Sequence, residues 1–388
     1  MSTLKINFTP ALSLLLFFSL FFNTESNVIV FYLAFLINIL YLFVCISSRL
    51  KLKIEPFVYF YFLFLCWAML SVAWARNVDL AISMNIRLVI LFFCIVFTIN
   101  LQNNHSSLVK WGYYGLLAGV LVNVPLTFFD FFYISGRFSG TTINPNHISL
   151  FSGFVIFLSI LNRRVLSSSI LILAIVFCSY LILMTGSRKG LLLVMVSLSI
   201  LLFNLDRKKT SFSYLGMLGL VGIGFLFFFV SQLEYLSTIH PTFIRFYELT
   251  QINVNDLSRE GFGGDGSTRW RLIFIVEGFS IFLHNPIAGI GLDNFKTIFS
   301  EDLYSHNNYV ELLSTLGIVG FCLNYIFYFS IFKQVLKSKT IFCVFIVFFF
   351  LLMDFAMVSY FERMYILPLI LIYFSAKSYN EIENTTSY

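Results

Sequence analysis

The run Ile341-Phe-Cys-Val-Phe-Ile-Val-Phe-Phe-Phe-Leu-Leu352 decides the fold, because it holds no charged side chain. It forms the centre of an apolar stretch over residues 340–360, and a bilayer core needs about 20 such residues per helix. Of the 388 residues in the chain, 59% are apolar, 50 are Phe and only 11% are charged. Soluble domains are about 25% charged, and disordered segments are poorly hydrophobic. The composition therefore excludes both classes and predicts an integral membrane protein.

Similar apolar runs recur along the chain and predict an all-α integral membrane protein with about twelve transmembrane helices. The predicted spans are residues 6–22, 27–46, 56–75, 84–100, 109–132, 146–161, 167–184, 188–203, 212–232, 308–331, 340–360 and 363–376. We expect nine spans within residues 1–232 and a large loop with short helices at 233–307. Residues 308–388 then hold the last three spans and a tail. No internal repeat is visible.

The distribution of cations predicts the orientation of these spans. Of the 25 Lys and Arg residues, 14 lie in the segments of one side, six in the short segments of the other side, and five in the long loop. Lys53 and Lys377 belong to the first set, and Arg76 belongs to the second. By the positive-inside rule both termini are cytoplasmic and the loop at 233–307 faces outward. No small-residue cleavage site follows the first apolar run, so we expect it to remain as a span. All six cysteines lie inside apolar runs, which predicts core packing rather than disulfides or metal ligands.

The unusual polar residues lie in the segments predicted to face outward. One is Arg-Phe-Ser-Gly-Thr-Thr-Ile-Asn-Pro-Asn-His at 137–147, and another is Thr-Gly-Ser-Arg-Lys-Gly at 185–190. In the long loop, a flexible glycine-rich stretch at 261–266 precedes residues 267–284, whose apolar core is too short to span a bilayer. We expect residues 267–284 to form a helix that lies in the membrane interface or packs on the bundle.

Arg269 and Arg271 fall in the first turn of that predicted helix, which is the unfavourable end of the helix dipole for a cation, at a cost of about 0.3 kcal/mol or more. A bound anion would remove this conflict. The segment 285–295 then forms a Pro/Gly turn, and Ser305-His-Asn-Asn308 leads into the span at 308–331. His306 is therefore predicted at the outer mouth of a membrane helix.

Four short elements occur in order on the outward side: Gly186-Ser-Arg188, Arg271 followed fifteen residues later by Pro286, Gly289-Ile-Gly291, and His306-Asn307. Together they resemble the signature of the O-antigen ligase/polymerase superfamily, a group of integral membrane glycosyltransferases with a Wzy-C-type region. The strong part of the resemblance covers about residues 180–320. The outward segment from Arg137 to Asn146 also looks like that of polymerase-type members.

The resemblance implies a metal-independent transferase without a cofactor, in the bacterial inner membrane, acting at the periplasmic face. The family's histidine matches His306, which is expected to be the general base. Its two diphosphate-binding arginines match Arg188 and a second residue. That residue is Arg271 if the spacing to Pro286 decides, which we prefer, or Arg269 if the Ser-Thr-Arg context decides. Further candidates for substrate binding are Arg137, Asn144, Asn146 and Asn307.

These residue types suit the transfer of a glycan from a lipid diphosphate. Arginine stays charged at any working pH and presents a planar fork that matches phosphate oxygens. Two arginines can therefore stabilise the negative charge that builds on the leaving group. Histidine, with an unperturbed pKa of about 6.5, can take the proton of an acceptor hydroxyl. No Asp-x-Asp pair occurs in an outward segment, which argues against a metal-dependent transferase, and direct displacement predicts inversion at the anomeric carbon.

Structural explanations compete with these roles. Arg188 could snorkel at the end of a span, and the arginines at 269 and 271 could anchor an interfacial helix beside Trp270. The four other histidines are predicted to be structural. Among them, His147 is also a candidate for function, because it follows Asn144-Pro-Asn146. Asp354 lies inside a predicted span, where an acid is either functional or paired with Arg87 or Arg363.

Three functions remain open from the sequence. The first is an O-antigen polymerase, which joins undecaprenyl-diphosphate-linked oligosaccharides as donor and acceptor, in membrane lipid and with a chain-length regulator as a candidate partner. The second is another transferase of this superfamily: the ligase that transfers the glycan to lipid A–core, followed by the protein O-glycan transferases. The third is a lipid-linked glycan flippase or other transporter, disfavoured because transporters usually show two related halves and midplane sites. The scattered cations exclude nucleic acid as a partner.

Overall fold

The computed structural model describes most of the chain. It describes residues 9–22, 27–47, 52–101, 105–134, 136–142, 144–163, 166–190, 193–194, 266–299, 303–337 and 341–386, with isolated residues between 234 and 251. The chain divides into two compact units, which are considered separately. The larger unit comprises Met1–Gly119 and Arg271–Tyr388, and the smaller unit comprises Val120–Trp270.

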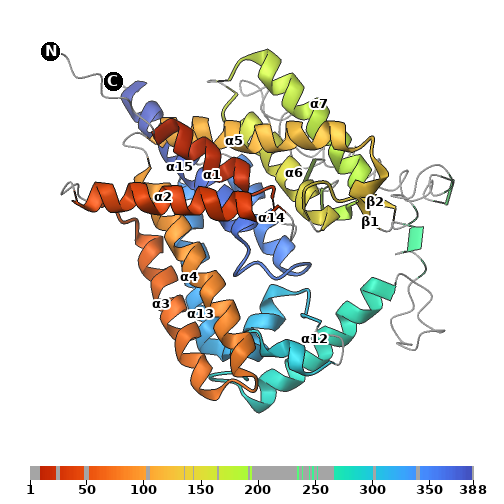
Figure 1. Cartoon of the computed structure of the whole chain (residues 1–388). Helices are drawn as coiled ribbons and strands as arrows, with labels where there is room; N and C mark the ends of the chain where they lie inside the picture. Colours follow the sequence, from red (N-terminus) through yellow and green to blue (C-terminus); the bar gives the residue numbers. More distant parts are fainter. Residues whose placement is uncertain are drawn as a thin grey trace, which may run out of the picture. The chain divides into compact units, whose positions relative to one another are not determined.

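The larger unit is helical, and α3, α4 and α13 lie side by side within it (Figure 1). Helix α13 also packs on α14 and α15, and α1 packs on α2. Its elements are α1 (Thr9–Ser19), α2 (Ile29–Ser47), α3 (Pro56–Leu70), η1 (Ser71–Trp74), α4 (Val78–Asn100), most of α5 (His105–Leu126), most of α12 (Gly266–His284), η3 (Asn294–Thr297), α13 (Asn308–Leu336), α14 (Ile341–Asp354) and α15 (Arg363–Thr386).

Helix α3 shows how the sequence makes a buried membrane helix. Pro56 stands in its first turn, where the missing N–H costs no hydrogen bond. The buried residues recur every three or four positions and therefore line one face. They are Phe57, Val58, Tyr61, Phe64, Leu65 and Ala68. The ring of Tyr61 packs edge-on against Phe327 of α13, with centroids 5.1 Å apart.

The smaller unit contains a short β-hairpin beside two packed helices. Its elements are the end of α5, η2 (Asp130–Phe132), β1 (Tyr133–Ile134), β2 (Arg137–Phe138), α6 (Pro145–Leu161) and α7 (Ser168–Thr185). The strands are antiparallel, with Ile134 opposite Arg137. Helix α6 is buried almost throughout, and α7 ends at Gly186, whose left-handed φ of 58° is typical of a helix C-cap.

The described helices support the all-α membrane fold. Each predicted span coincides with a described helix, except 188–203 and 212–232, which lie almost wholly or wholly outside the described residues. Among those residues, four helices are long and apolar enough to cross a membrane. They are Pro56–Trp74, Val78–Asn100, Ser168–Thr185 and Asn308–Leu336. The number of twelve spans and the outward position of the long loop stay predictions, and the glycine-rich stretch before Gly266 also lies outside the described residues.

Helix α13 is broken, although the sequence predicted one continuous span there. Gly317 has φ 64° and ψ −168°, which no helix permits. The backbone groups freed by the break pair with the loop at 285–295. N–H groups of this loop donate to the carbonyls of Ser314 and Thr315 at 3.0 and 2.9 Å, and one of its carbonyls accepts from the N–H of Ile318 at 2.8 Å. Unpaired backbone N–H and C=O groups are costly in a membrane, so the break in α13 depends on the hydrogen bonds that the loop supplies.

Candidate functional site

The mouth of α13 is a tight turn built from Ser305, His306 and Asn307. The side-chain oxygen of Asn307 caps the helix by accepting from the N–H of Val310 at 3.1 Å. The hydroxyl of Ser305 donates to the carbonyl of Asn307 at 2.8 Å and accepts from its N–H at 3.3 Å. Between them, His306 has a φ of 55°, a left-handed conformation that is uncommon outside glycine. Asn307, a candidate for substrate binding, is thus also the helix cap.

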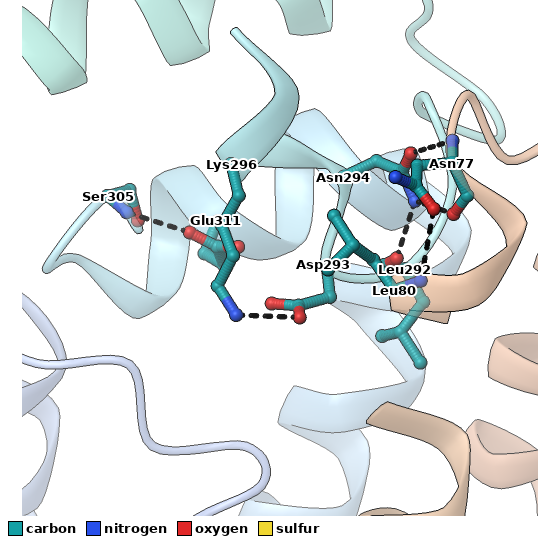
Figure 2. Close-up of polar contacts among 8 residues, drawn as sticks. All are labelled: Asn77, Leu80, Leu292, Asp293, Asn294, Lys296, Ser305 and Glu311. Atoms are coloured by element: carbon teal, nitrogen blue, oxygen red, sulfur yellow. Dashed lines mark hydrogen bonds and ion pairs between the residues drawn. The ribbon is translucent and has the colours of Figure 1, made fainter. Parts of the chain in front are cut away.

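A buried acid that the sequence analysis missed supports this turn. Glu311 lies in the first turn of α13 with only 1% of its surface exposed. Its Oε2 atom accepts a hydrogen bond of 3.0 Å from the N–H of Ser305, as Figure 2 shows. Figure 2 also places the ion pair of Lys296 and Asp293, 2.8 Å long, beside this acid. The available signal was an acid at the start of the predicted span 308–331, five residues after His306.

The imidazole of His306 lies against aromatic rings. Its centroid is 4.2 Å from that of Tyr304 and 6.4 Å from that of Phe274, with which it is stacked. Phe274 belongs to α12 and packs with Phe295 and Phe299 in a small apolar cluster. The predicted helix at 267–284 therefore exists and packs on the segment that carries His306.

Arg271 lies on the α12 face that packs toward His306. Residues 271, 274 and 278 share one helix face, and both Phe274 and Gly278 are buried. Burial raises the pKa of Tyr304 to about 12; the charge of Glu362 also raises this pKa, whereas the charge of Arg271 lowers it. Arg271 and His306 thus have Tyr304 as a common neighbour.

Arg269 occupies a different face of the same helix. It lies two residues before Arg271, which is about 200° around the helix axis. Its guanidinium carbon stands 5.5 Å from the centroid of the Trp270 ring, a distance typical of a cation–π contact. The structure therefore associates Arg271 with His306 and gives Arg269 an aromatic contact of its own.

The 285–295 loop holds α12 and the α13 mouth to the start of α4. The amide of Asn294 bonds the backbone of Asn77 through both its oxygen and its nitrogen, and Asn77 in turn caps α4 (Figure 2). Gly289 and Gly291 have positive φ angles of 66° and 100°. A Cβ on Gly289 would lie 2.3 Å from the Thr315 backbone, so the Gly-Ile-Gly motif has a packing role.

In the smaller unit, Arg137 and Asn146 hold the turn that precedes Arg188. The Nε of Arg137 donates to the carbonyl of Thr185 at 2.8 Å, and its Nη2 donates to the side-chain oxygen of Asn146 at 3.2 Å. The same oxygen accepts from the Ser187 hydroxyl at 3.0 Å. Arg188 then begins a helical turn at 188–190.

Asn144 has a helix-capping role, because its side chain accepts from the N–H of Asn146 at the start of α6. The structure thus brings Arg137 and Asn146 together at the Arg188 turn in the smaller unit. In the larger unit it brings Arg271 to the neighbourhood of His306 and Asn307. His306 and Arg271 belong to the larger unit, and Arg188 belongs to the smaller unit.

The predicted ion pair of Asp354 with Arg87 or Arg363 is wrong. The carboxylate accepts hydrogen bonds from Tyr325 at 2.7 Å and from Ser359 at 2.6 Å, with longer bonds from Asn308 and Tyr365. These neutral donors satisfy a buried acid without a cation. The guanidinium of Arg363 instead stands 3.6 Å from the centroid of the Phe31 ring. Because Asn308 follows Asn307, the network also fixes the mouth of α13.

Within the part of the chain that the structure describes, no group of three or more His, Cys, Asp or Glu side chains is placed to hold a metal ion. The features above define a multi-pass α-helical membrane protein with a histidine held at the mouth of a broken helix. Residues 173–325 match the family described as O-antigen ligase (Wzy_C), which supports the resemblance to the O-antigen ligase/polymerase superfamily. The predicted resemblance is confirmed there, and the match includes Arg188, Arg269, Arg271 and His306. A comparison with curated proteins finds no match.

Proposed function

We propose that this protein is an O-antigen polymerase of the bacterial inner membrane, acting at the periplasmic face. It transfers a glycan from undecaprenyl diphosphate to a hydroxyl group of a second lipid-linked repeat unit. Two observations support the proposal: the family match over residues 173–325, and the resemblance of the Arg137–Asn146 segment to polymerase-type members. The observation that carries it is the placement of His306 in a fixed turn, with Arg271 as a neighbour across Tyr304.

In the proposed reaction, His306 accepts the proton of the acceptor hydroxyl. The hydroxyl oxygen bonds to the anomeric carbon as the bond from that carbon to the phosphate oxygen breaks. Undecaprenyl diphosphate leaves with the bonding electrons and with an added negative charge. Arg188 and Arg271 stabilise that charge, since charge-assisted bonds from guanidinium to phosphate are among the strong hydrogen bonds of proteins. A single displacement of this kind inverts the anomeric centre.

The second candidate is the ligase that moves the finished glycan to lipid A–core. The matching family is described as O-antigen ligase, which favours this candidate, and the same arginines and histidine would serve it. The two activities differ in the acceptor rather than in the chemistry, so a test must observe the acceptor.

Deletion of the gene, followed by gel analysis of the lipopolysaccharide, tests the proposal. We expect core carrying a single repeat unit, because attachment continues while polymerisation stops. Complementation with the wild-type gene should restore long chains, and His306→Asn should not. Bare core with long polymer still on the carrier would overturn the polymerase proposal in favour of the ligase. Unchanged polymer length and attachment would overturn both.

A further inference from the structure

Glu311 is a buried acid for which the proposed reaction has no role. It lies at 1% exposure in the first turn of α13, where an unsupported carboxylate is costly. Its Oε2 atom accepts from the N–H of Ser305, the residue directly before His306 (Figure 2). An apolar side chain of similar volume would pack there without this cost. The presence of an acid at this buried position is explained by the turn that it supports.

The turn at His306 needs support on both sides. A non-glycine residue in the left-handed region costs roughly 1 kcal/mol and persists when surrounding contacts hold it. Asn307 fixes the following side through its cap on Val310. The hydroxyl of Ser305 closes the turn on itself but does not connect it to the body of α13. The bond from Ser305 to Glu311 makes that connection on the preceding side.

We propose that Glu311 is the positioning residue of His306: its carboxylate ties Ser305 to α13 and so holds the imidazole against Tyr304 and Phe274, at the α12 face of Arg271. This inference rests on the proposed function for its catalytic consequence. A bond from N–H to a carboxylate is stronger than a bond to a neutral acceptor, which gives a reason for an acid rather than an amide at this position.

The charge of Glu311 has a second consequence for His306. When Glu311 is ionised, the negative charge beside Ser305 favours the imidazolium form that arises when the base takes a proton. Among the described residues, the other charged groups around the turn are Arg271 on α12, Glu362 before α15, and the ion pair of Asp293 and Lys296 at η3. Removing the charge of Glu311 should therefore move the titration midpoint of His306 to lower pH.

The test uses the full chain, purified in detergent, with Glu311→Gln and Glu311→Ala. Glu277→Gln is the matched control, because Glu277 is an exposed acid on α12. Two quantities are measured. One is transfer from an undecaprenyl-diphosphate-linked oligosaccharide against pH. The other is the titration of the His306 imidazole by nitrogen NMR, with its signal assigned by loss in His306→Asn.

We expect Glu311→Ala to lower kcat by about 10- to 100-fold, with less than about a twofold change in donor KM, because positioning acts on the chemical step. Glu311→Gln keeps an acceptor for Ser305 and should recover part of the rate, with the imidazole midpoint still moved to lower pH. If both variants keep wild-type rates and an unchanged midpoint, the positioning role is overturned while the proposed function stands. If the wild type transfers nothing while the midpoint moves in Glu311→Gln, the proposed function falls and the structural link between Glu311 and His306 stands. Should Glu311→Ala fail to fold, the Gln variant alone decides the outcome.

Discussion

Arg271 and Arg269 are two residues apart, and the structure gives their side chains different surroundings. Arg271 lies on the α12 face of Phe274, whose ring stacks on His306, and its charge acts on Tyr304. Arg269 lies about 200° around the helix, against the ring of Trp270. A guanidinium that stabilises the leaving diphosphate must lie near the base that activates the acceptor. We therefore keep Arg271, rather than Arg269, as the proposed diphosphate-binding residue of α12.

Substituting each arginine in turn tests this assignment. We expect Arg271→Ala to lower kcat/KM for transfer by about 100- to 1,000-fold, the usual loss for one electrostatic donor to a transition state. Arg271→Lys should recover part of this loss, since lysine keeps the charge but lacks the planar fork. Arg269→Ala should change kcat/KM by less than about threefold, as expected of a partly exposed cation–π contact. A larger loss for Arg269→Ala than for Arg271→Ala would reverse the assignment.

Among the elements, α13 and the 285–295 loop depend on one another. The break at Gly317 exposes backbone groups that the loop satisfies, and Trp67 of α3 donates to the carbonyl of Leu316 at 3.1 Å. The loop can approach this closely because Gly289 has no side chain. The loop also fixes the position of α12. A substitution that disturbs the contact between the loop and the break should therefore also change the positions of Arg271 and His306.

Gly289→Ala tests the contact between loop and break, with Gly136→Ala as the control. Both glycines have positive φ, 66° and 72°, so both variants carry the left-handed penalty of roughly 1 kcal/mol. A Cβ at Gly289 would lie 2.3 Å from the Thr315 backbone, whereas a Cβ at Gly136 meets nothing within 4 Å. We expect Gly289→Ala to lower the thermal unfolding midpoint clearly more, with an overpacking cost of about 1–3 kcal/mol added. Equal midpoints for the two variants would show that the loop moves away from the break without cost.

The element scale also shows what a sequence can and cannot predict. Apolar run lengths located α3, α4, α7 and α13, because burial in lipid leaves a strong compositional signal. The break at Gly317 left no such signal, since a glycine within a membrane helix is common and its φ depends on a loop far along the chain. Motif order predicted roles for His306 and Arg271, and both residues lie within the matched region 173–325.

The partners of buried polar groups could not be predicted in the same way. One of the two alternatives for Asp354 was a paired cation, yet hydroxyl groups of α13, of α15 and of the segment between α14 and α15 satisfy it. Glu311 was overlooked because its role depends on where the backbone of Ser305 lies. Contacts of this kind are set by tertiary structure, whereas span and motif predictions depend on local sequence.

Within the larger unit, two groups of polar contacts lie at the opposite ends of α3. At one end, the backbone of Lys53 bonds the side chain of Asn100, and Glu55 pairs with Lys377 at 2.8 Å. At the other end, the turn at Arg76 and Asn77 bonds the 285–295 loop. The sequence predicted Lys53 and Lys377 on the cytoplasmic side and Arg76 on the outward side. The grouping within this unit agrees with that alternation, and which end faces the periplasm stays a prediction.

Thiol labelling of the two ends of α3 tests the orientation. Lys53 and Arg76 are both exposed cations that flank the same helix, so Lys53→Cys and Arg76→Cys form a matched pair. With a membrane-impermeant maleimide on spheroplasts, we expect Arg76→Cys to be labelled and Lys53→Cys to react only after lysis. The wild-type chain under the same conditions corrects for native thiols such as the exposed Cys322. Labelling of Lys53→Cys from outside would place the 285–295 loop and His306 at the cytoplasmic face. A periplasmic polymerase and a periplasmic ligase would then both be excluded, whatever the variants of His306 and Arg271 showed.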